Sequence, residues 1–127
     1  MDTARPPCYP ACVRILIADD EAVNQRVLAR MAERLGYRAA VVGDGKGLVE
    51  AFMRDRPGAV LCDIHLGADD GVALCSRLRE LDPLVPIKLM TGDPGAIARA
   101  EAAGFSRVLS KPFTSDALKE ALSALRP

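Results

Sequence analysis

Residues 60–67 read VLCDIHLG, an apolar run that is interrupted by the carboxylate of Asp63. Residues 59–62 are four apolar residues in succession, a pattern that favours a strand covered on both faces over an amphipathic one. Asp63 falls where such a strand would end, and residues 67–71 supply a loop before the next helical pattern. In open parallel sheets, ligand chemistry gathers beyond the carboxyl ends of the strands. Because a single Asp is also a common turn former, the other strand ends must decide whether Asp63 is functional.

The rest of the chain alternates between apolar runs and helical patterns. Besides the strand that ends at Asp63, a buried strand is expected at 13–18, and further strands at 39–42, 87–90 and 107–110. Helices are expected at 22–35, 46–54, 72–81 and 95–103, and from Thr114 or Ser115, either of which can cap the last helix. Five strands that alternate with five helices predict an α/β fold, a doubly wound five-stranded parallel sheet with helices on both faces.

The apolar positions of the helices predict which side chains face the sheet. In the first helix the apolar residues recur every four positions, and in the third they are expected to point inward. These positions are Val23, Val27, Met31 and Leu35 in the first helix, Leu48 and Phe52 in the second, Val72, Cys75, Leu78 and Leu81 in the third, and Leu118, Ala121, Leu122 and Leu125 in the last. The fourth helix is almost all alanine and carries little apolar surface beyond Ile97.

Length and charge exclude several classes of protein. A chain of 127 residues is one domain with a proper core, and its 17 basic and 17 acidic residues leave no basic excess for a nucleic acid. No segment has the length or apolar character of a signal peptide or a membrane span. We therefore expect a cytoplasmic protein that binds neither nucleic acid nor membrane. Residues 1–11, with three prolines, are expected to form a flexible N-terminal arm, and residues 12–127 the folded domain.

The four cysteines do not predict a zinc site. Such a site needs two closely spaced pairs of ligands, but only Cys8 and Cys12 are close, and His65 is the only histidine. Cys62 and Cys75 lie in apolar patterns and are expected to be buried thiols that behave as small hydrophobic residues.

Polar residues with related chemistry stand at the ends of four predicted strands. The first strand ends in Asp19 and Asp20, the third in Asp63, the fourth in Thr91 and the fifth in Lys111. Clustered carboxylates repel one another unless a cation is present, and a set of oxygen ligands suits Mg²⁺. A magnesium ion would neutralise the cluster and polarise a phosphoryl oxygen. The pattern predicts phosphoryl transfer with a carboxylate as the nucleophile.

Each of these residues also has a simpler interpretation. Asp19 and Asp20 could only mark a helix N-terminus, where acidic side chains complement the helix dipole. Thr91 beside a glycine could be only a turn residue, and Lys111 only a solvated loop lysine. An exposed loop His such as His65 is more often a bystander than a side-chain metal ligand. The agreement of four strand ends favours the functional interpretation.

Four motifs carry a resemblance to a known family. They are residues 15–21 (ILIADDE), the strand that ends at Asp63, residues 90–92 (MTG) and residues 110–113 (SKPF). In this order they resemble the receiver domain of bacterial two-component response regulators, of the chemotaxis-regulator type. The resemblance covers about residues 13–125 and implies a flavodoxin-like sheet with strand order 2-1-3-4-5.

The resemblance implies a phosphorelay function centred on Asp63. This residue would accept a phosphoryl group from a histidine kinase or a phosphotransfer protein. Mg²⁺ would be bound directly by Asp20, by Asp63 and by the backbone carbonyl of His65, and Asp19 would act mainly through a metal-bound water. The chain would not be an enzyme beyond its own phosphorylation and dephosphorylation.

The resemblance also implies how phosphorylation of Asp63 would affect a downstream protein. The hydroxyl of Thr91 would move to the new phosphoryl oxygen, Lys111 would pair with that oxygen, and the Lys111–Pro112 bond would be cis. A downstream protein would bind the face formed by helix four, strand five and helix five.

Three positions depart from the usual pattern of the family. Val108 stands where an aromatic residue usually reports phosphorylation, and residues 66–68 (LGA) replace a common Pro-Gly. His65 lies two residues after the acceptor, where side chains affect how quickly water reaches the acyl phosphate. Since Val108 is short and stiff, we expect switching to rely on residues 92–104, which include the weakly buried fourth helix.

Two alternatives remain open, as does the context of the chain. A magnesium-dependent aspartyl-phosphate phosphatase would normally need a second Asp where His65 stands. A degenerate pseudo-receiver would only bind a partner, which the intact acidic set disfavours. No output domain follows Leu125, so we expect a stand-alone regulator or an excised receiver, and Asn24 in the run DDEAVN suggests a receiver of a hybrid kinase.

Overall fold

The computed structural model describes residues 13–123, whose central feature is a five-stranded parallel sheet. The strands are β1 (Arg14–Ala18), β2 (Arg38–Val42), β3 (Ala59–Asp63), β6 (Ile87–Thr91) and β7 (Leu109–Ser110). Their order across the sheet is β2-β1-β3-β6-β7, and each neighbouring pair is parallel. This confirms the expected order 2-1-3-4-5. The expected N-terminal arm and Leu125 lie outside the described residues.

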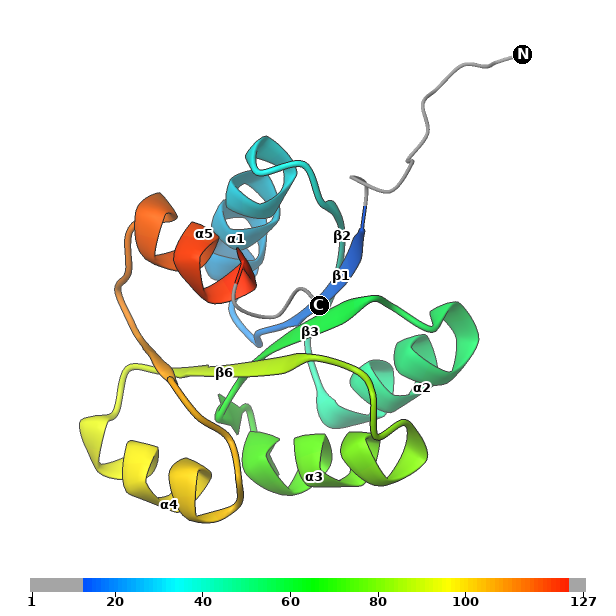
Figure 1. Ribbon diagram of the computed structural model, residues 1–127, viewed down its shortest axis with the longest axis vertical. Helices are drawn as coiled ribbons and strands as arrows, with labels where there is room; N and C mark the ends of the chain where they lie inside the picture. Colours follow the sequence, from blue (N-terminus) through cyan, green and yellow to red (C-terminus); the bar gives the residue numbers. More distant parts are fainter. Residues whose placement is uncertain (1–12, 124–127) are drawn as a thin grey trace.

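Helices cover both faces of this sheet, as the alternating pattern predicts. They are α1 (Ala22–Arg34), α2 (Gly45–Asp55), α3 (Gly71–Leu81), α4 (Ile97–Ala102) and α5 (Ser115–Ser123), with a 3-10 turn, η2 (Pro94–Ala96), immediately before α4. Figure 1 shows α1 and α5 on one face and α2, α3 and α4 on the other. None of the helices within residues 13–123 is long and apolar enough to cross a membrane.

Two groups of apolar side chains fill the space between the sheet and its helices. One joins the strands to α2 and α3 around Phe52 and Leu78, and the other joins them to α1 and α5 around Leu28 and Leu118. Every residue of β3 is buried, as expected for the apolar run 59–62. The strand that carries Asp63 is therefore held in place from both faces.

The buried face of α1 differs from the one that the four-residue spacing suggests. Val23 and Val27 are 62% and 50% exposed, whereas Leu28 and Ala32 are buried. A spacing of four residues advances about 40° around a helix with 3.6 residues per turn. Val23 and Val27 are therefore rotated away from the sheet. Leu81, which was expected to point inward, is also exposed, because it is the last residue of α3.

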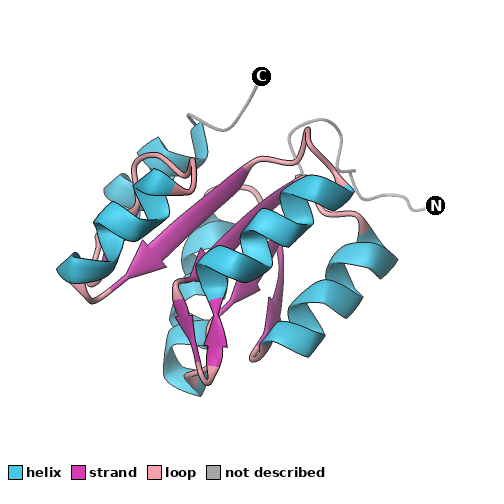
Figure 2. Ribbon diagram, turned by 90° about the horizontal axis from the view of Figure 1, so that it is seen from below, coloured by secondary structure: helices cyan, strands magenta, loops and turns pink. Residues whose placement is uncertain are grey.

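The loop after β3 contains a hairpin that the sequence did not predict. The short antiparallel strands β4 (His65–Leu66) and β5 (Asp69–Asp70) stand between Asp63 and α3 (Figure 2). At the other edge of the sheet, β7 is shorter than the expected strand at 107–110. Arg107 has a φ of 56°, a left-handed conformation that does not continue a strand.

Candidate functional site

The topology brings the predicted strand ends to one edge of the sheet. Asp63 is the last residue of β3, and Thr91 is the last residue of β6. Asp19 follows β1, whose last residue pairs with the residue before Asp63. Lys111 follows β7, whose last residue pairs with Thr91. The parallel register thus places four chain segments, distant in sequence, at the same carboxyl edge.

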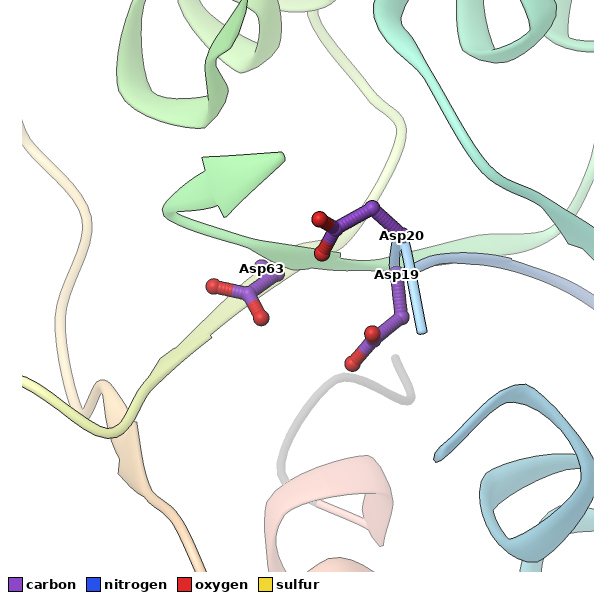
Figure 3. Close-up of side chains that lie close together, drawn as sticks. All are labelled: Asp19, Asp20 and Asp63. Carbon is purple, nitrogen blue, oxygen red and sulfur yellow. The ribbon is translucent and has the colours of Figure 1, made fainter. Parts of the chain in front are cut away.

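Three carboxylates converge at this edge. Oxygen atoms of Asp19, Asp20 and Asp63 all lie within 4.8 Å of one another, and Figure 3 shows the three groups around a shared space. Asp19 is fully buried and Asp63 is nearly so, whereas Asp20 is exposed. The predicted acidic cluster is therefore formed, with Asp20 on its solvent side.

The ammonium group of Lys111 joins the two buried carboxylates of the cluster. Its Nζ atom donates to Asp63 Oδ2 at 2.6 Å and to Asp19 Oδ2 at 2.8 Å. Burial lowers the pKa of Lys111, but its hydrogen bonds to Asp19 and Asp63 outweigh this effect, so its pKa is raised above the usual value. The lysine is therefore firmly charged at neutral pH.

Backbone N–H groups fix the second oxygen of each buried carboxylate. Asp19 Oδ1 accepts from the N–H of Glu21 at 2.9 Å, and Asp63 Oδ1 accepts from the N–H of His65 at 2.9 Å. Asp19 thus orients the start of α1 as well as the cluster. Each buried carboxylate is held by one backbone donor and one shared ammonium, which sets its orientation before any ligand arrives.

The donor set of the cluster fits a hard divalent cation. The three carboxylates have one ammonium group beside them, which contacts two of them, so the edge carries an excess of negative charge. Like charges this close repel one another unless a cation is present. Carboxylate oxygens are ligands that Mg²⁺ prefers, whereas Zn²⁺ favours nitrogen and sulfur. The exposed position of Asp20 leaves the cluster open to such an ion from solvent.

The side chains of Thr91 and His65 both meet the loop that follows β6. The hydroxyl of Thr91 accepts from the N–H of Asp93 at 2.9 Å and donates to the Asp93 carbonyl at 3.4 Å. The Nε2 atom of His65 lies 3.5 Å from Asp93 Oδ2. Asp93 in turn accepts from the N–H of Gly95 and caps η2. The side chains of Thr91 and His65 are thus tied to the chain that enters α4.

Two acidic residues of the hairpin have roles that the sequence analysis missed. Asp69 Oδ2 accepts from the N–H of Gly45 at 2.8 Å and fastens the hairpin to the start of α2. Asp70 caps α3 by accepting from the N–H of Val72 at 3.0 Å, and it forms an ion pair with Arg99. An Asp directly before a helix start is a recognisable capping signal, so the first role of Asp70 could have been found.

The buried cysteines and the peptide bond after Lys111 agree with the sequence-based expectations. Cys62 and Cys75 are free thiols within the core, and the pKa of Cys62 is raised by its contact with Cys75 and by burial. These thiols are inert packing groups. Cys8 and Cys12 lie outside the described residues. The Lys111–Pro112 bond is cis, as the resemblance implies.

Comparison with known proteins places these features in a family. The family model described as "Response regulator receiver domain" matches residues 15–123. The chain is 32% identical over 111 residues to the sensor histidine kinase RcsC of Salmonella typhi, which covers 86% of this chain and 12% of that protein. It is 33% identical over 116 residues to the response regulator MprA of Mycolicibacterium vanbaalenii, covering 90% of this chain and 49% of that protein.

Solved structures show the same arrangement of helices and strands. The response regulator receiver domain (CheY-like) from Methylobacillus flagellatus superposes with a TM-score of 0.83 at 23% identity, over 91% of this chain and 99% of that chain. At this identity the likeness concerns the fold alone. The chain spans less than half the length of the two relatives above.

Proposed function

Because this chain belongs to the response regulator receiver domain family, we propose that it accepts a phosphoryl group from phosphohistidine onto Asp63. The modified site would then switch a protein–protein surface. The observation that carries the proposal is the contact between Lys111 and two members of the acidic cluster at the sheet edge. A family likeness alone would leave open a degenerate receiver, but here the nucleophile, its counter-charge and a set of cation ligands occur together.

Asp63 is the nucleophile of the proposed transfer. A carboxylate oxygen attacks the phosphorus of the donor phosphohistidine, a P–O bond forms, and the P–N bond breaks. The histidine nitrogen leaves with the electron pair of that bond. In phosphoryl transfer most of the catalysis comes from positioning and from neutralising charge. Lys111, 2.6 Å from Asp63 Oδ2, supplies a fixed positive charge where the phosphoryl oxygens gather.

The acidic cluster is the proposed magnesium site. Asp20, Asp63 and the backbone carbonyl of His65 would bind the ion directly, and Asp19 would act mainly through a bound water. When bound, Mg²⁺ neutralises the carboxylates and withdraws charge from the phosphoryl oxygens. Asp19 and Asp63 have their orientations set by Lys111 and by backbone N–H groups.

Thr91 is the proposed link from the modified acceptor to the rest of the domain. Its hydroxyl is now engaged with the backbone of Asp93. If the hydroxyl turns to a phosphoryl oxygen, the N–H of Asp93 loses its acceptor, and the loop into η2 must rearrange. This rearrangement would displace α4, which forms the proposed output face together with β7 and α5.

The surface of α1 next to the acceptor is the proposed docking face for the phosphodonor, a histidine kinase or a phosphotransfer protein. Val23 and Val27 are exposed there. A neighbouring groove of about 250 Å³ is lined by Asn24, Val27, Leu28, Met31, Lys111, Pro112 and Phe113. This groove runs from the apolar side of α1 to Lys111, so a partner bound there would reach Asp63.

We also propose a cytoplasmic location, since the free thiols of Cys62 and Cys75 suit a reducing compartment.

Incubation with a small phosphodonor such as acetyl phosphate tests this function. With Mg²⁺ present, the intact mass of the protein should rise by one phosphoryl group, and chelation of the metal should prevent the gain. The phosphorylated protein should lose the group slowly in buffer, since an acyl phosphate hydrolyses. No gain with Mg²⁺ would favour a pseudo-receiver, and rapid continuous consumption of the donor would favour a phosphatase.

Magnesium alone should stabilise the unmodified protein. An ion that binds only the folded state stabilises it by mass action, by about 1.4 kcal/mol at ten times its Kd, which corresponds to roughly 5 °C in Tm for a domain of this size. Asp20→Ala should lose most of this response, while its Tm without metal stays at or above that of the parent because one source of repulsion is gone. Differential scanning fluorimetry with a Mg²⁺ titration measures both values.

Glu33→Ala is the matched control for the magnesium titration. Glu33 is an exposed acid on α1, away from the cluster, so this variant should respond as the parent does. If Asp20→Ala gains as much stability as the parent, the ion binds elsewhere and the proposed ligand set is wrong.

A further inference from the structure

The helix α4 is held to the domain by unusually little apolar surface. It has six residues, of which only Ala100 is buried, and Ile97 at its start is half-buried. Packing of small side chains resists displacement weakly, because little apolar area is removed from water. Specific side-chain contacts therefore help to decide where α4 sits. One comes from Arg79 of α3, the neighbour of α4 in Figure 1, and the other from Asp70, the β5 residue that caps α3.

The first contact holds the chain where α4 ends. The guanidinium of Arg79, in the last turn of α3, lies 3.8 Å from the centre of the Phe105 ring. The same group donates to the carbonyl of Gly104 at 3.0 Å. Phe105 is buried in the core, so this end combines a cation–π contact, a hydrogen bond and apolar packing. It is the firmly anchored end of the segment.

The second contact lies on the side of the phospho-acceptor. Arg99 Nη1 donates to Asp70 Oδ2 at 2.9 Å and to Oδ1 at 3.1 Å. Burial would raise the pKa of Asp70, but Arg99 and the N–H groups of Val72 and Ala73 outweigh it, so this pKa is lowered and the pair stays ionised at neutral pH. Both side chains are about half exposed, 48% and 47%. Ion pairs in such positions contribute little to stability, and a small change can break them.

Asp70 belongs to the hairpin that begins at the acceptor. The N–H of His65 donates to Asp63 Oδ1, and His65 is the residue directly paired with Asp70 across β4 and β5. A hydrogen bond of 2.7 Å from the N–H of Gly71 to the carbonyl of Ile64 closes the hairpin. A continuous series of contacts therefore leads from the carboxylate of Asp63 to α4.

We propose that the Asp70–Arg99 ion pair is a latch that holds α4 against α3 while Asp63 is unmodified, and that phosphorylation of Asp63 releases it. The released helix pivots about the Arg79–Phe105 contact. This inference rests on the proposed function and deepens it, since it names the contact through which the modified site acts on its output helix. Val108 is too short and stiff to relay the change as a rotating aromatic side chain would, and the latch supplies a route that does not use it.

The physical cause of release is the charge and bulk added at Asp63. A phosphoryl group brings additional negative charge and three strong acceptor oxygens. They compete for the N–H of His65, which now bonds to Asp63 Oδ1, and so displace the hairpin strand that pairs with Asp70. The same group attracts the hydroxyl of Thr91 away from Asp93. The start of the η2–α4 segment and the latch thus loosen together, while the Phe105 end stays in place.

Hydrogen exchange in the unmodified protein tests the latch itself. Asp70→Asn keeps a capping side chain for α3, because Asn caps as well as Asp, but it removes the charge that binds Arg99. Asp70→Asn and Arg99→Gln should each raise amide exchange in residues 97–102 about two- to five-fold. Exchange in α1 should not change. The control is Arg54→Gln, which removes an exposed ion pair with Asp55 that joins no two elements and should leave α4 unaffected.

Binding of beryllofluoride with Mg²⁺, a mimic of the phosphoryl group, tests the coupling to Asp63. If modification must break the latch, reciprocity requires that breaking the latch favours modification by the same factor. Asp70→Asn and Arg99→Gln should therefore bind beryllofluoride about two- to five-fold more tightly than the parent. The increase in α4 exchange on binding should be correspondingly smaller in both variants.

Each result decides a separate part of the inference. If amide exchange at 97–102 equals that of the parent in both variants, the ion pair does not restrain α4. Raised exchange with unchanged beryllofluoride affinity would show that the latch is not coupled to Asp63. If the parent fails to bind beryllofluoride, the proposed function and the coupling to Asp63 are both wrong. Amide exchange in the unmodified variants still decides whether the ion pair restrains α4.

Discussion

Asp63→Asn is expected to abolish phosphorylation completely under conditions in which the parent is fully labelled. An amide nitrogen or oxygen cannot replace the carboxylate as the nucleophile, so the mass gain with acetyl phosphate and Mg²⁺ should vanish. Asparagine has nearly the same shape as aspartate, but its single amide oxygen can keep only one of the two hydrogen bonds that Asp63 accepts, from Lys111 or from the N–H of His65. The substitution also removes one of three clustered negative charges. The reduced repulsion opposes the loss of one hydrogen bond, so the variant should remain folded at the assay temperature, which circular dichroism checks, and the loss of labelling would be chemical.

Asp69→Asn is the matched control for the loss of phosphorylation. Asp69 lies in the same hairpin region, but its carboxylate accepts from the N–H of Gly45 and does not belong to the acidic cluster. An Asn side chain can accept the same hydrogen bond, and this variant should be labelled as the parent is. Labelling of Asp63→Asn at another residue, to the same extent as the parent, would overturn the assignment of the nucleophile.

Gly71→Ala is expected to cause the largest loss of stability of any single methyl addition near the site. A Cβ atom at this position would overlap the carbonyl oxygen of Asp63 and lie 2.9 Å from the Cα of Ile64. Both contacts are with backbone atoms of the central strand and its extension, which cannot rotate away. Overpacking of this kind costs about 3 kcal/mol, or roughly 10 °C in Tm for a domain of this size. Thermal denaturation measures the change.

Gly92→Ala provides the corresponding control. A Cβ atom there would have only Lys111 Cβ nearby, at 3.9 Å, which is an ordinary contact. Its free energy of unfolding should stay within about 0.5 kcal/mol of the parent value. If Gly71→Ala is as stable as Gly92→Ala, the hairpin does not pack against the end of β3 as described, and the path from Asp63 to Asp70 loses its basis.

The sequence predicts the sheet and the site for the same physical reason. Parallel strands that are buried on both faces appear as continuous apolar runs, and here polar residues follow these runs. Once the strands are recognised, Asp63, Thr91 and Lys111 must share an edge, because each stands at the carboxyl end of its strand or directly after it. The sequence alone therefore places the acidic cluster and its lysine together.

The hairpin after Asp63 could not be predicted because its strands have only two residues each. No periodicity can emerge over that length, and residues 67–71 instead resemble a glycine-bounded loop. The hairpin depends on tertiary contacts, among them the bonds from the N–H of Gly45 to Asp69 and from Arg99 to Asp70. Long-range pairs of this kind leave no local signal.

Two burial patterns also escaped the sequence analysis because they depend on neighbours. Lys88 is buried in β6, where its ammonium donates to the carbonyl of Ser106 at 3.1 Å and burial lowers its pKa. A charged residue within an apolar strand gives no indication of such a partner. In α1, several apolar residues compete for the inner face, and packing against β2 and α5 selects Leu28 and Ala32 over Val23 and Val27.

The most direct test of the central claim is to locate the phosphoryl group chemically. Protein treated with acetyl phosphate and Mg²⁺ is reduced with borohydride, which converts an aspartyl phosphate to homoserine, and peptides are then mapped by mass spectrometry. Homoserine is expected at position 63 and nowhere else, with none formed when the metal is chelated. Homoserine at position 19 or 20 with residue 63 unchanged, or a phosphoryl group that survives on His65, would contradict the central claim.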